Sequence, residues 1–293
     1  MSLNKQMTTT DVVAQLQDGM TIGVGGWGPR RKPMALIREI LRSDLKDLTI
    51  VGYGGMDMGM LCAAGKVKKL IYGFVSLDFI PLEPFFRKAR EAGSIEALEL
   101  DEGMLHWGLR AAGYRLPFLP MRAGLGTAFM HNNPEIKTVN SPYDDGETLL
   151  AMPAIKLDAA LLQVHKADQL GNVRVYSPDP FFDEWFARAA DKTYVLAEDV
   201  CERLDSDEAD AKANLFERSL VSGVVEQRGG AHPTSHVPGY GWDAAHIKRY
   251  CQAAAEDGGW QAYVDEFLGA TEADYQNAVG GLDAITSLPR QVL

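Results

Sequence analysis

The sequence has 293 residues, 46% of them hydrophobic, and a formal net charge of −11, so it can form one large α/β domain or two small ones. The negative charge argues against a nucleic-acid or anionic-membrane partner, and no apolar run is long enough to span a bilayer. The polar N-terminus has no signal-peptide core, so we expect a soluble, cytoplasmic protein.

The elements expected in the first half alternate between helices and strands. They are a helix capped by Asp11 and ending at Leu16, strands at 21–24, 48–51, 70–73 and 95–100, and a helix at 34–41 opened by Pro33. Two of the strands run into glycine-rich loops, 25–28 and 52–55. This order predicts an open, mostly parallel sheet flanked by helices, with ligands bound beyond the carboxyl ends of the strands.

The second half continues this alternation and then changes character. The expected elements are strands at 159–164, 194–197 and 220–226, a helix at 181–190, a charged solvated helix or linker at 202–218, and helical stretches at 243–257, 260–268 and 271–279. We therefore divide the chain into an α/β domain, residues 1–230, and a C-terminal helical extension packed on it, residues 231–293.

The cysteines and histidines give no pattern typical of a metal site. Cys62, Cys201 and Cys251 lie far apart without a CxxC pair, which argues against both a disulfide framework and a zinc site. The six histidines show no metal-ligand spacing, so we expect structural roles for them and no bound metal.

A carboxylate and a guanidinium each follow the end of an apolar element. Asp101 has the residue type and position of a helix cap, which places Glu102 at the mouth of a largely apolar helix. Arg122 precedes a flexible turn that contains Gly124 and Gly126. Glu102 and Arg122 form a candidate site, although an acid in the first turn is also explained by the helix dipole alone, which this stretch by itself favours.

The first glycine loop, Gly23 to Gly28, formally matches the G-x-G-x-x-G pattern of dinucleotide-binding proteins. Pro33 starts the helix too late for that fold, and the second strand ends in glycines instead of an acid, so we do not expect a nicotinamide cofactor. Backbone N–H groups in the loop can contact a ligand, and three cations follow that can meet phosphate or carboxylate, although a solvated turn fits the spacing equally well. The residues concerned are Gly25, Gly26, Arg30, Arg31 and Lys32.

Three ordered segments resemble the α subunit of the family I coenzyme A transferases, nearest to the glutaconate branch. They are residues 21–28 with Pro33, residues 157–172, and residues 230–234 before Tyr240. Segments 28–34, 72–78, 101–105 and 122–126 are further similar to a hydrolase-like branch that opens a steroid ring in cholesterol-degrading bacteria. The resemblance covers nearly the whole chain and implies the coenzyme A transferase fold, which is like that of NagB and RpiA.

The resemblance to the hydrolase-like branch implies a function and a partner. It implies the A (α) subunit of an enzyme that adds water to a cyclohexenone carboxyl-CoA and cleaves a ring C–C bond, paired with a β-type (B) subunit as an α2β2 heterotetramer. Glu102 matches the active glutamate of that branch and would be the general base, in a partly buried position. The substrate would be the CoA thioester itself, without a cofactor, bound by Arg122, Gly25, Gly26, Arg30, Arg31, Lys32 and Ser76.

Two other functions stay open. The chain can be the α subunit of a true family I transferase of the glutaconate or 3-oxoacid type, with the catalytic glutamate on the β subunit. It can also be a non-catalytic subunit that only completes its partner's pocket.

Overall fold

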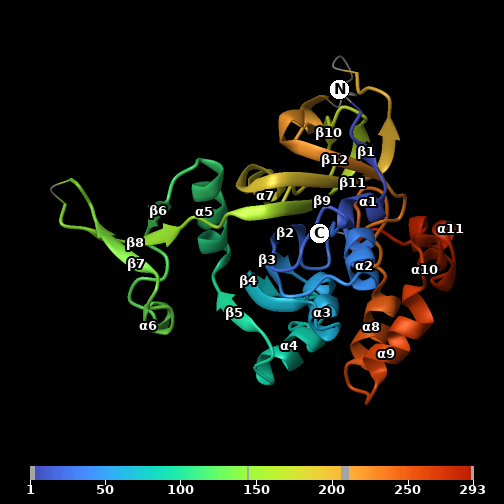
Figure 1. The fold of residues 1–293 in the computed structure, drawn as a ribbon, viewed down its shortest axis with the longest axis horizontal. Coiled ribbons are helices and arrows are strands. Elements are labelled where there is room, and N and C mark those ends of the chain that lie inside the picture. The colour runs from blue at the N-terminus through green and yellow to red at the C-terminus, as the bar shows by residue number, and fades with distance from the viewer. Residues whose placement is uncertain (1–3, 144, 206–210, 292–293) are drawn as a thin grey trace.

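The computed structural model describes residues 4–143, 145–205 and 211–291 and is built on one large sheet (Figure 1). The order of strands across the sheet is β1-β12-β11-β9-β2-β3-β4-β5, with β10 added antiparallel to β9. The strands are β1 (Gln6–Met7), β2 (Thr21–Trp27), β3 (Leu48–Gly54), β4 (Val67–Val75), β5 (Glu96–Glu99), β9 (Leu157–Asp168), β10 (Val173–Arg174), β11 (Ala190–Cys201) and β12 (Val221–Glu226). All the other pairings among these strands are parallel, which confirms the predicted open, mostly parallel sheet.

Helices cover both faces of the sheet and bury two apolar cores. The first core lies under α1 (Thr9–Val13), α2 (Met34–Arg42), α3 (Met56–Ala63), α4 (Pro84–Glu91) and the C-terminal helices. The second core lies under α5 (Glu102–Gly113) and α7 (Asp183–Ala189). The central strands are apolar on both sides because both of their faces are covered.

Three local predictions need correction. Thr8, not Asp11, caps α1, and the helix ends at Val13, before Leu16. The helix expected from residue 181 begins at Asp183 because Phe181 has a positive φ of 57°, which is not a helical conformation. In the charged segment, residues 206–210 lie outside the described part, and the described remainder holds only the short 3₁₀ turns Ala211–Ala213 and Arg218–Leu220.

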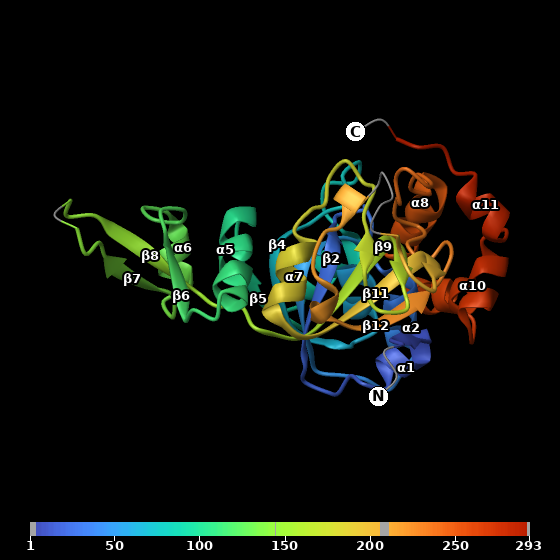
Figure 2. The same ribbon diagram turned by 90° about the horizontal axis from the view of Figure 1, so that it is seen from above.

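An arm, residues 118–153, projects from the body of the molecule beside α5 (Figures 1 and 2). It consists of β6 (Phe118–Met121), α6 (Ala128–Asn132), β7 (Lys137–Asn140) and β8 (Thr148–Pro153), and its strands form a separate antiparallel sheet in the order β6-β8-β7. Sequence reasoning did not predict this sheet. Its strands are four to six residues long and pair only with one another, so they lack the long buried runs that mark the main sheet.

The C-terminal helices pack beside α2 on the first face of the sheet (Figure 2). They are α8 (Ala244–Ala253), α9 (Gly259–Tyr263) with a π-helical turn at Val264–Leu268, α10 (Glu272–Ala278) and α11 (Leu282–Thr286). A buried ion pair between Arg38 and Glu272 joins α10 to α2, with Nε and Oε2 at 2.9 Å. The helical character was predicted, whereas the division at residue 230 stays a prediction. Within the described residues, we find no helix with the length and apolarity that crossing a membrane requires.

Candidate active site

The first turn of α5 carries the acid that sequence reasoning singled out. Asp101 caps the helix as predicted, since its side chain accepts a hydrogen bond of 2.7 Å from the backbone N–H of Met104. Glu102 is the first residue of the helix and is exposed. The expectation that Glu102 is partly buried is therefore wrong for this chain alone, because none of its described elements covers that side of the helix mouth.

The carboxyl ends of β3 and β4 fix the backbone of Glu102. The Tyr53 hydroxyl, near the end of β3, donates a hydrogen bond of 2.9 Å to the carbonyl oxygen of Glu102. Gly73 in β4 lies close below it, since a Cβ built on Gly73 would be 3.3 Å from the Cα of Glu102. Burial, and then the carboxylates of Glu102 and Asp101, raise the pKa of Tyr53, so its hydroxyl keeps its proton and remains a donor. Glu102 is thus held at the sheet edge where ligands bind in open α/β folds.

Aromatic rings form a continuous wall between Glu102 and the glycine loop. The ring centroids are 4.7 Å apart for Trp27 and Phe74, 5.9 Å for Phe74 and Tyr53, and 5.0 Å for Tyr53 and Phe182. His106 continues the series at 4.4 Å from Phe182. These five residues are here called the aromatic wall. Tyr53 is buried behind the others, and the four that keep some exposure can pack against an alicyclic ring. Sequence reasoning missed them, although Trp27 and Tyr53 both lie where a strand runs into glycines.

The glycine loop is held from inside the chain by Asp183 at the start of α7. Its Oδ1 accepts the N–H of Gly26 at 2.9 Å, and its Oδ2 lies 2.6 Å from Nη1 of Arg31. The side chains of Arg31 and Asp183 are 2% and 0% exposed. A Cβ on Gly25 would lie 2.7 Å from Asp183, and one on Gly26, at a φ of +75°, would lie 2.4 Å from the Arg31 carbonyl oxygen. The Gly26 N–H and the Arg31 guanidinium, which we expected to contact a ligand, therefore hold the loop in place instead.

Lys32 connects the two glycine loops inside the chain. Its Nζ donates to the Tyr53 carbonyl oxygen at 2.6 Å and lies 3.1 Å from Oδ2 of Asp57, with both charged side chains fully buried. The other oxygen of Asp57 accepts the N–H of Gly55 at 2.7 Å. Burial lowers the pKa of Lys32, and Asp57 opposes this shift. Lys32 thus contacts the floor of the site instead of facing solvent.

Arg30 and Ser76 reach the surface beside the loop. Nη2 of Arg30 lies 2.5 Å from Oδ2 of Asp78, and its side chain remains 20% exposed. The Arg30 guanidinium lies over the ring of Trp27, 4.9 Å from the centroid. The Ser76 hydroxyl accepts the N–H of Asp78 at 3.0 Å. Arg30 is therefore the one cation of the 30–32 triplet that keeps access to solvent.

Arg122 lies on the arm and is held by an acid that sequence reasoning did not single out. Its guanidinium binds Glu147 through two hydrogen bonds, of 2.5 Å from Nε and 2.8 Å from Nη2. The antiparallel pairing of β6 with β8 brings the two residues together. The Arg122 side chain remains 78% exposed, so its predicted contact with a substrate stays a prediction.

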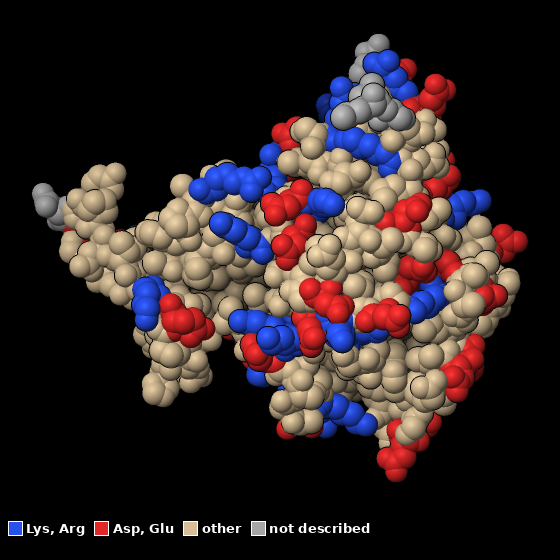
Figure 3. Space-filling view, in the orientation of Figure 1, with Lys and Arg blue, Asp and Glu red and all other residues tan. Residues whose placement is uncertain are grey.

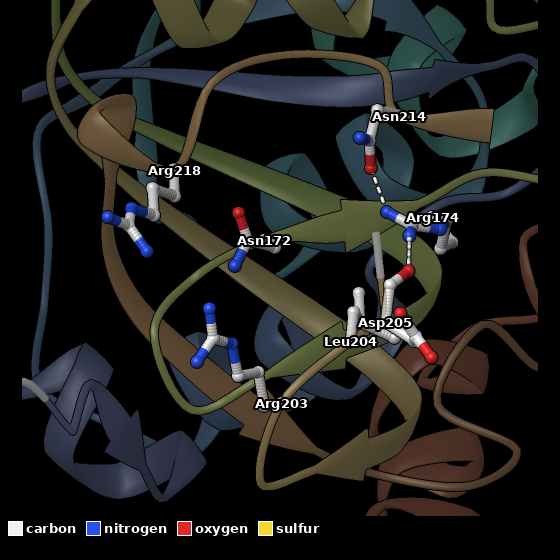
Figure 4. A pocket seen from close by; sticks show the side chains of 7 residues that line it. All are labelled: Asn172, Arg174, Arg203, Leu204, Asp205, Asn214 and Arg218. Carbon is white, nitrogen blue, oxygen red and sulfur yellow. Dashed lines mark hydrogen bonds between the residues drawn. The ribbon is translucent and has the colours of Figure 1, made fainter. Parts of the chain in front are cut away.

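A separate polar cavity of about 490 Å³ lies around the β9–β10 hairpin and the turn before β12 (Figure 4). In Figure 4, Arg174 donates hydrogen bonds to the Asn214 side chain and to the Asp205 carbonyl oxygen. None of the predicted site residues lines it, and β12 and β11 lie across the sheet from β4 and β5. We therefore keep the candidate site at α5. The lining residues are Asn172, Arg174, Arg203, Leu204, Asp205, Asn214 and Arg218.

Charged side chains are unevenly distributed over the face seen in Figure 3. They are frequent over the body and sparse over the arm. Exposed apolar side chains occur where α5 leads into the arm: Tyr114 is 54% exposed, Leu116 42% and Phe118 37%. This part of the surface, at the end of α5 opposite to Glu102, has the composition of an interface.

The sequence as a whole matches known proteins. The Coenzyme A transferase family model matches residues 6–227. The chain is 48% identical over 288 residues to the cholesterol ring-cleaving hydrolase IpdA subunit of Mycobacterium tuberculosis (strain ATCC 25618 / H37Rv), covering 96% of this chain and 99% of that protein.

Solved structures share the fold over most of the chain. Glutaconate coenzyme A-transferase from Acidaminococcus fermentans superposes with a TM-score of 0.88 at 27% identity, covering 96% of this chain and 94% of that one. A variant of the decarboxylase AibA/AibB superposes with a TM-score of 0.81 at 27% identity, covering 90% of this chain and 98% of that one.

Proposed function

The chain belongs to the coenzyme A transferase family, and from this premise we propose that it is the A (α) subunit of an acyl-CoA ring-opening hydrolase of bacterial steroid degradation. The observation that carries the proposal is the exposed carboxylate of Glu102, on a residue held at the ligand-binding edge of the sheet in a chain that is 48% identical to an IpdA subunit along its length. The substrate class is a cyclic β-keto acyl-CoA, specifically a cyclohexenone carboxyl-CoA.

In the proposed reaction Glu102 is the general base. It takes a proton from water, and the resulting hydroxide adds to the ring ketone to form a tetrahedral alkoxide. Collapse of the alkoxide breaks the bond to the carbon next to the thioester, which leaves a carboxylic acid and an enolate of the thioester. The enolate takes back the proton held by Glu102, so one water is consumed and the ring is open. A positioned base of this kind contributes roughly a hundredfold to ten-thousandfold.

The other predicted site residues divide into two roles in this proposal. Gly25, Gly26, Arg31 and Lys32 position the floor of the site, because their contacts are inside the chain. The groups offered to the substrate are Arg30, Ser76 and Arg122, all of which keep some exposure. The aromatic wall would accept the alicyclic ring, and the acyl-CoA is used as a substrate without a cofactor.

A β-type (B) subunit would complete the site, in an α2β2 heterotetramer. The exposure of Glu102 in this chain supports the proposal, because a base working on water needs a cover that excludes bulk solvent. The apolar side chains exposed where α5 leads into the arm lie at the other end of this helix, so a B subunit that covers both would contact α5 along its length. As an enzyme acting on a CoA thioester, the complex would work in the cytoplasm.

The test uses the purified complex with its B subunit and a cyclohexenone carboxyl-CoA. We expect Glu102→Gln and Glu102→Ala to lower the rate of ring opening by at least about a hundredfold, while acyl-CoA binding measured by calorimetry persists. Glu99→Gln is the matched control, since Glu99 is an exposed acid three residues earlier at the end of β5, and it should keep its turnover. Near-full turnover in both Glu102 variants would exclude Glu102 as the base.

The fate of solvent oxygen separates the proposal from coenzyme A transfer, which the fold shared with glutaconate coenzyme A-transferase keeps as the alternative. In ¹⁸O-labelled water, hydrolysis places one labelled oxygen in the new carboxylate. A transferase instead forms a glutamyl-CoA adduct that borohydride traps and intact-mass measurement detects. A subunit with no catalytic role would show changed affinity in the Glu102 variants with unchanged turnover.

A further inference from the structure

His106 lies one helical turn after Glu102 on the same face of α5. Residues four apart on a helix are neighbours, so the side chains of Glu102 and His106 leave the same face of α5. The ring is half-buried and packs against Phe182 in a tilted arrangement, with centroids 4.4 Å apart and planes inclined by 38°. His106 therefore joins the aromatic wall to the mouth of α5.

The partner of His106 fixes which ring nitrogen carries the proton. Nε of Arg110 donates a hydrogen bond of 3.0 Å to Nε2 of His106. A guanidinium can only donate, so Nε2 must be the acceptor and the ring proton lies on Nδ1. Arg110 is itself held between the rings of Trp107 and Trp185, 5.5 Å and 4.7 Å from their centroids.

The surroundings keep this imidazole neutral. Burial, and then the charge of Arg110, lower the pKa of His106 to about 4. The other charged residues of its own helix and of α7, which packs against it, are Glu102 and, on α7, Asp183, Glu184 and Arg188. On α7, Asp183 is paired with Arg31 and Glu184 with Arg188, so neither acid is free to hold a proton on the ring.

The Nδ1–H of His106 remains available to a ligand. In the described part of the chain no hydrogen bond is formed at this atom. The two ring nitrogens point in widely different directions, and Nε2 points toward Arg110, one turn further along α5. The Nδ1–H therefore points away from Arg110, on a ring that leaves the same face of α5 as Glu102.

We propose that His106 is a second catalytic residue, which donates its Nδ1–H to the ketone oxygen of the substrate while water activated by Glu102 adds to the same carbonyl. This inference rests on the proposed function. The hydrogen bond strengthens as negative charge develops on that oxygen, and a neutral imidazole with its tautomer already fixed needs no reorganisation at that moment. No proton is transferred from His106, so the balance of the hydrolysis is unchanged.

Three variants of the assembled complex test the donor. His106→Ala removes it, and we expect kcat to fall by roughly a hundredfold to a thousandfold with little change in KM for the acyl-CoA. His106→Asn keeps an N–H near the Nδ1 position and should restore most of the rate. His106→Gln places its amide near Nε2, where Arg110 lies, and should not. A merely structural histidine would not distinguish Asn from Gln in kcat while assembly and melting temperature stay alike, and equal activity of the two variants would overturn the proposal.

A second measurement reads the tautomer without reference to activity. The ¹⁵N NMR spectrum of histidine-labelled complex should show His106 neutral at pH 7 with the proton on Nδ1, and Arg110→Met should change that tautomer ratio. A proton on Nε2 in the unmodified complex would overturn the inference. The two proposals fail separately: if the Glu102 variants are inactive and His106→Ala is fully active, only the role of His106 falls. If the Glu102 variants keep their turnover, the proposed hydrolase mechanism falls.

Discussion

The interior of the site and its rim contain different kinds of charged residue. Inside, Arg31 pairs with Asp183 and Lys32 with Asp57, and all four side chains are at most 2% exposed. At the rim, Glu102 is exposed and Arg122 is 78% exposed. Charges of the first kind determine the shape of the floor, whereas those of the second kind remain accessible to a substrate or a partner, even though Arg122 also binds Glu147. The type and sequence position of a charged residue do not show whether it is buried or accessible, since Arg30, Arg31 and Lys32 are consecutive.

The largest expected effect on the free energy of unfolding comes from breaking the buried ion pair between Arg31 and Asp183. Asp183→Ala leaves the buried Arg31 guanidinium without its counter-charge and the Gly26 N–H without its acceptor, so we expect a loss of about 3–5 kcal/mol in the free energy of unfolding. The measurement is urea denaturation of the purified chain. Glu184→Ala is the control, since the neighbouring Glu184 pairs with a partly exposed Arg188, and it should cost at most about 1 kcal/mol.

The buried acid Glu83 makes the free energy of unfolding depend on pH, whereas an exposed acid such as Glu102 should not. It caps α4, its carboxylate accepts the N–H of Phe86 at 2.6 Å, and burial raises its pKa to about 7. Because this is above the value in the unfolded chain, the folded state holds the proton more tightly. The contribution of this proton to the free energy of unfolding is complete below pH 4.5 and is lost as the pH rises through about 7, a change of about 3 kcal/mol.

The measurement for Glu83 compares unfolding free energies at pH 5 and pH 8. Glu83→Gln cannot titrate and should lack this part of the slope, whereas Glu102→Gln, which changes an exposed acid, should keep it. Identical slopes in the original chain and in Glu83→Gln would show that Glu83 does not titrate with a raised pKa.

Alanine substitutions at two glycines with positive φ distinguish the cost of backbone strain from the cost of a steric contact inside the chain. An alanine at Gly26 would place its Cβ 2.4 Å from the Arg31 carbonyl oxygen, whereas one at Gly126 in the arm would meet nothing within 4 Å. We expect Gly26→Ala to cost about 2–3 kcal/mol and Gly126→Ala about 1 kcal/mol, measured by urea denaturation. Equal losses would mean that the contact with Arg31 is relieved without cost.

The smallest effect on folding is expected at the rim. Arg122→Ala removes an exposed guanidinium, so the melting temperature of the chain should change by no more than about 2 °C. The same substitution in the complex should weaken acyl-CoA binding or assembly, measured by calorimetry and by size-exclusion chromatography. If binding and assembly are both unchanged, Arg122 has no part in the site.

The main sheet could be predicted from sequence because each central strand is a continuous apolar run next to a turn signal. The strands at 21–24, 48–51, 159–164 and 194–197 all lie within strands of the structure. The family resemblance seen in short segments is confirmed by the family model, which matches residues 6–227. The arm was missed because the turn signals around Gly124 and Gly126 do not show which short strands pair across them.

The position of Glu102 could be predicted because its determinant, the Asp101 cap, is local. The interior pairs could not, because they join distant parts of the chain: Arg31 and Asp183 are 152 residues apart. Asp183 reads as an ordinary first-turn acid in sequence, and only the packing of α7 beneath the glycine loop gives it its role. His106 was assigned a structural role, since nothing in the sequence indicates the bond from Arg110.

The arm leaves and rejoins the body at neighbouring points. The N–H of Ala154 donates to the Pro117 carbonyl oxygen at 3.0 Å, and the N–H of Ile155 donates to that of Gly108 at 2.9 Å. The two ends of the arm therefore lie close together, so the connection between α5 and β9 does not depend on the length of its outer part, whereas Leu150 and Met152 at its base belong to the second core. Relatives with the same sheet can therefore differ in the size of the arm. A variant that lacks its outer part would show, by comparison with the full chain, which contacts between subunits depend on the arm.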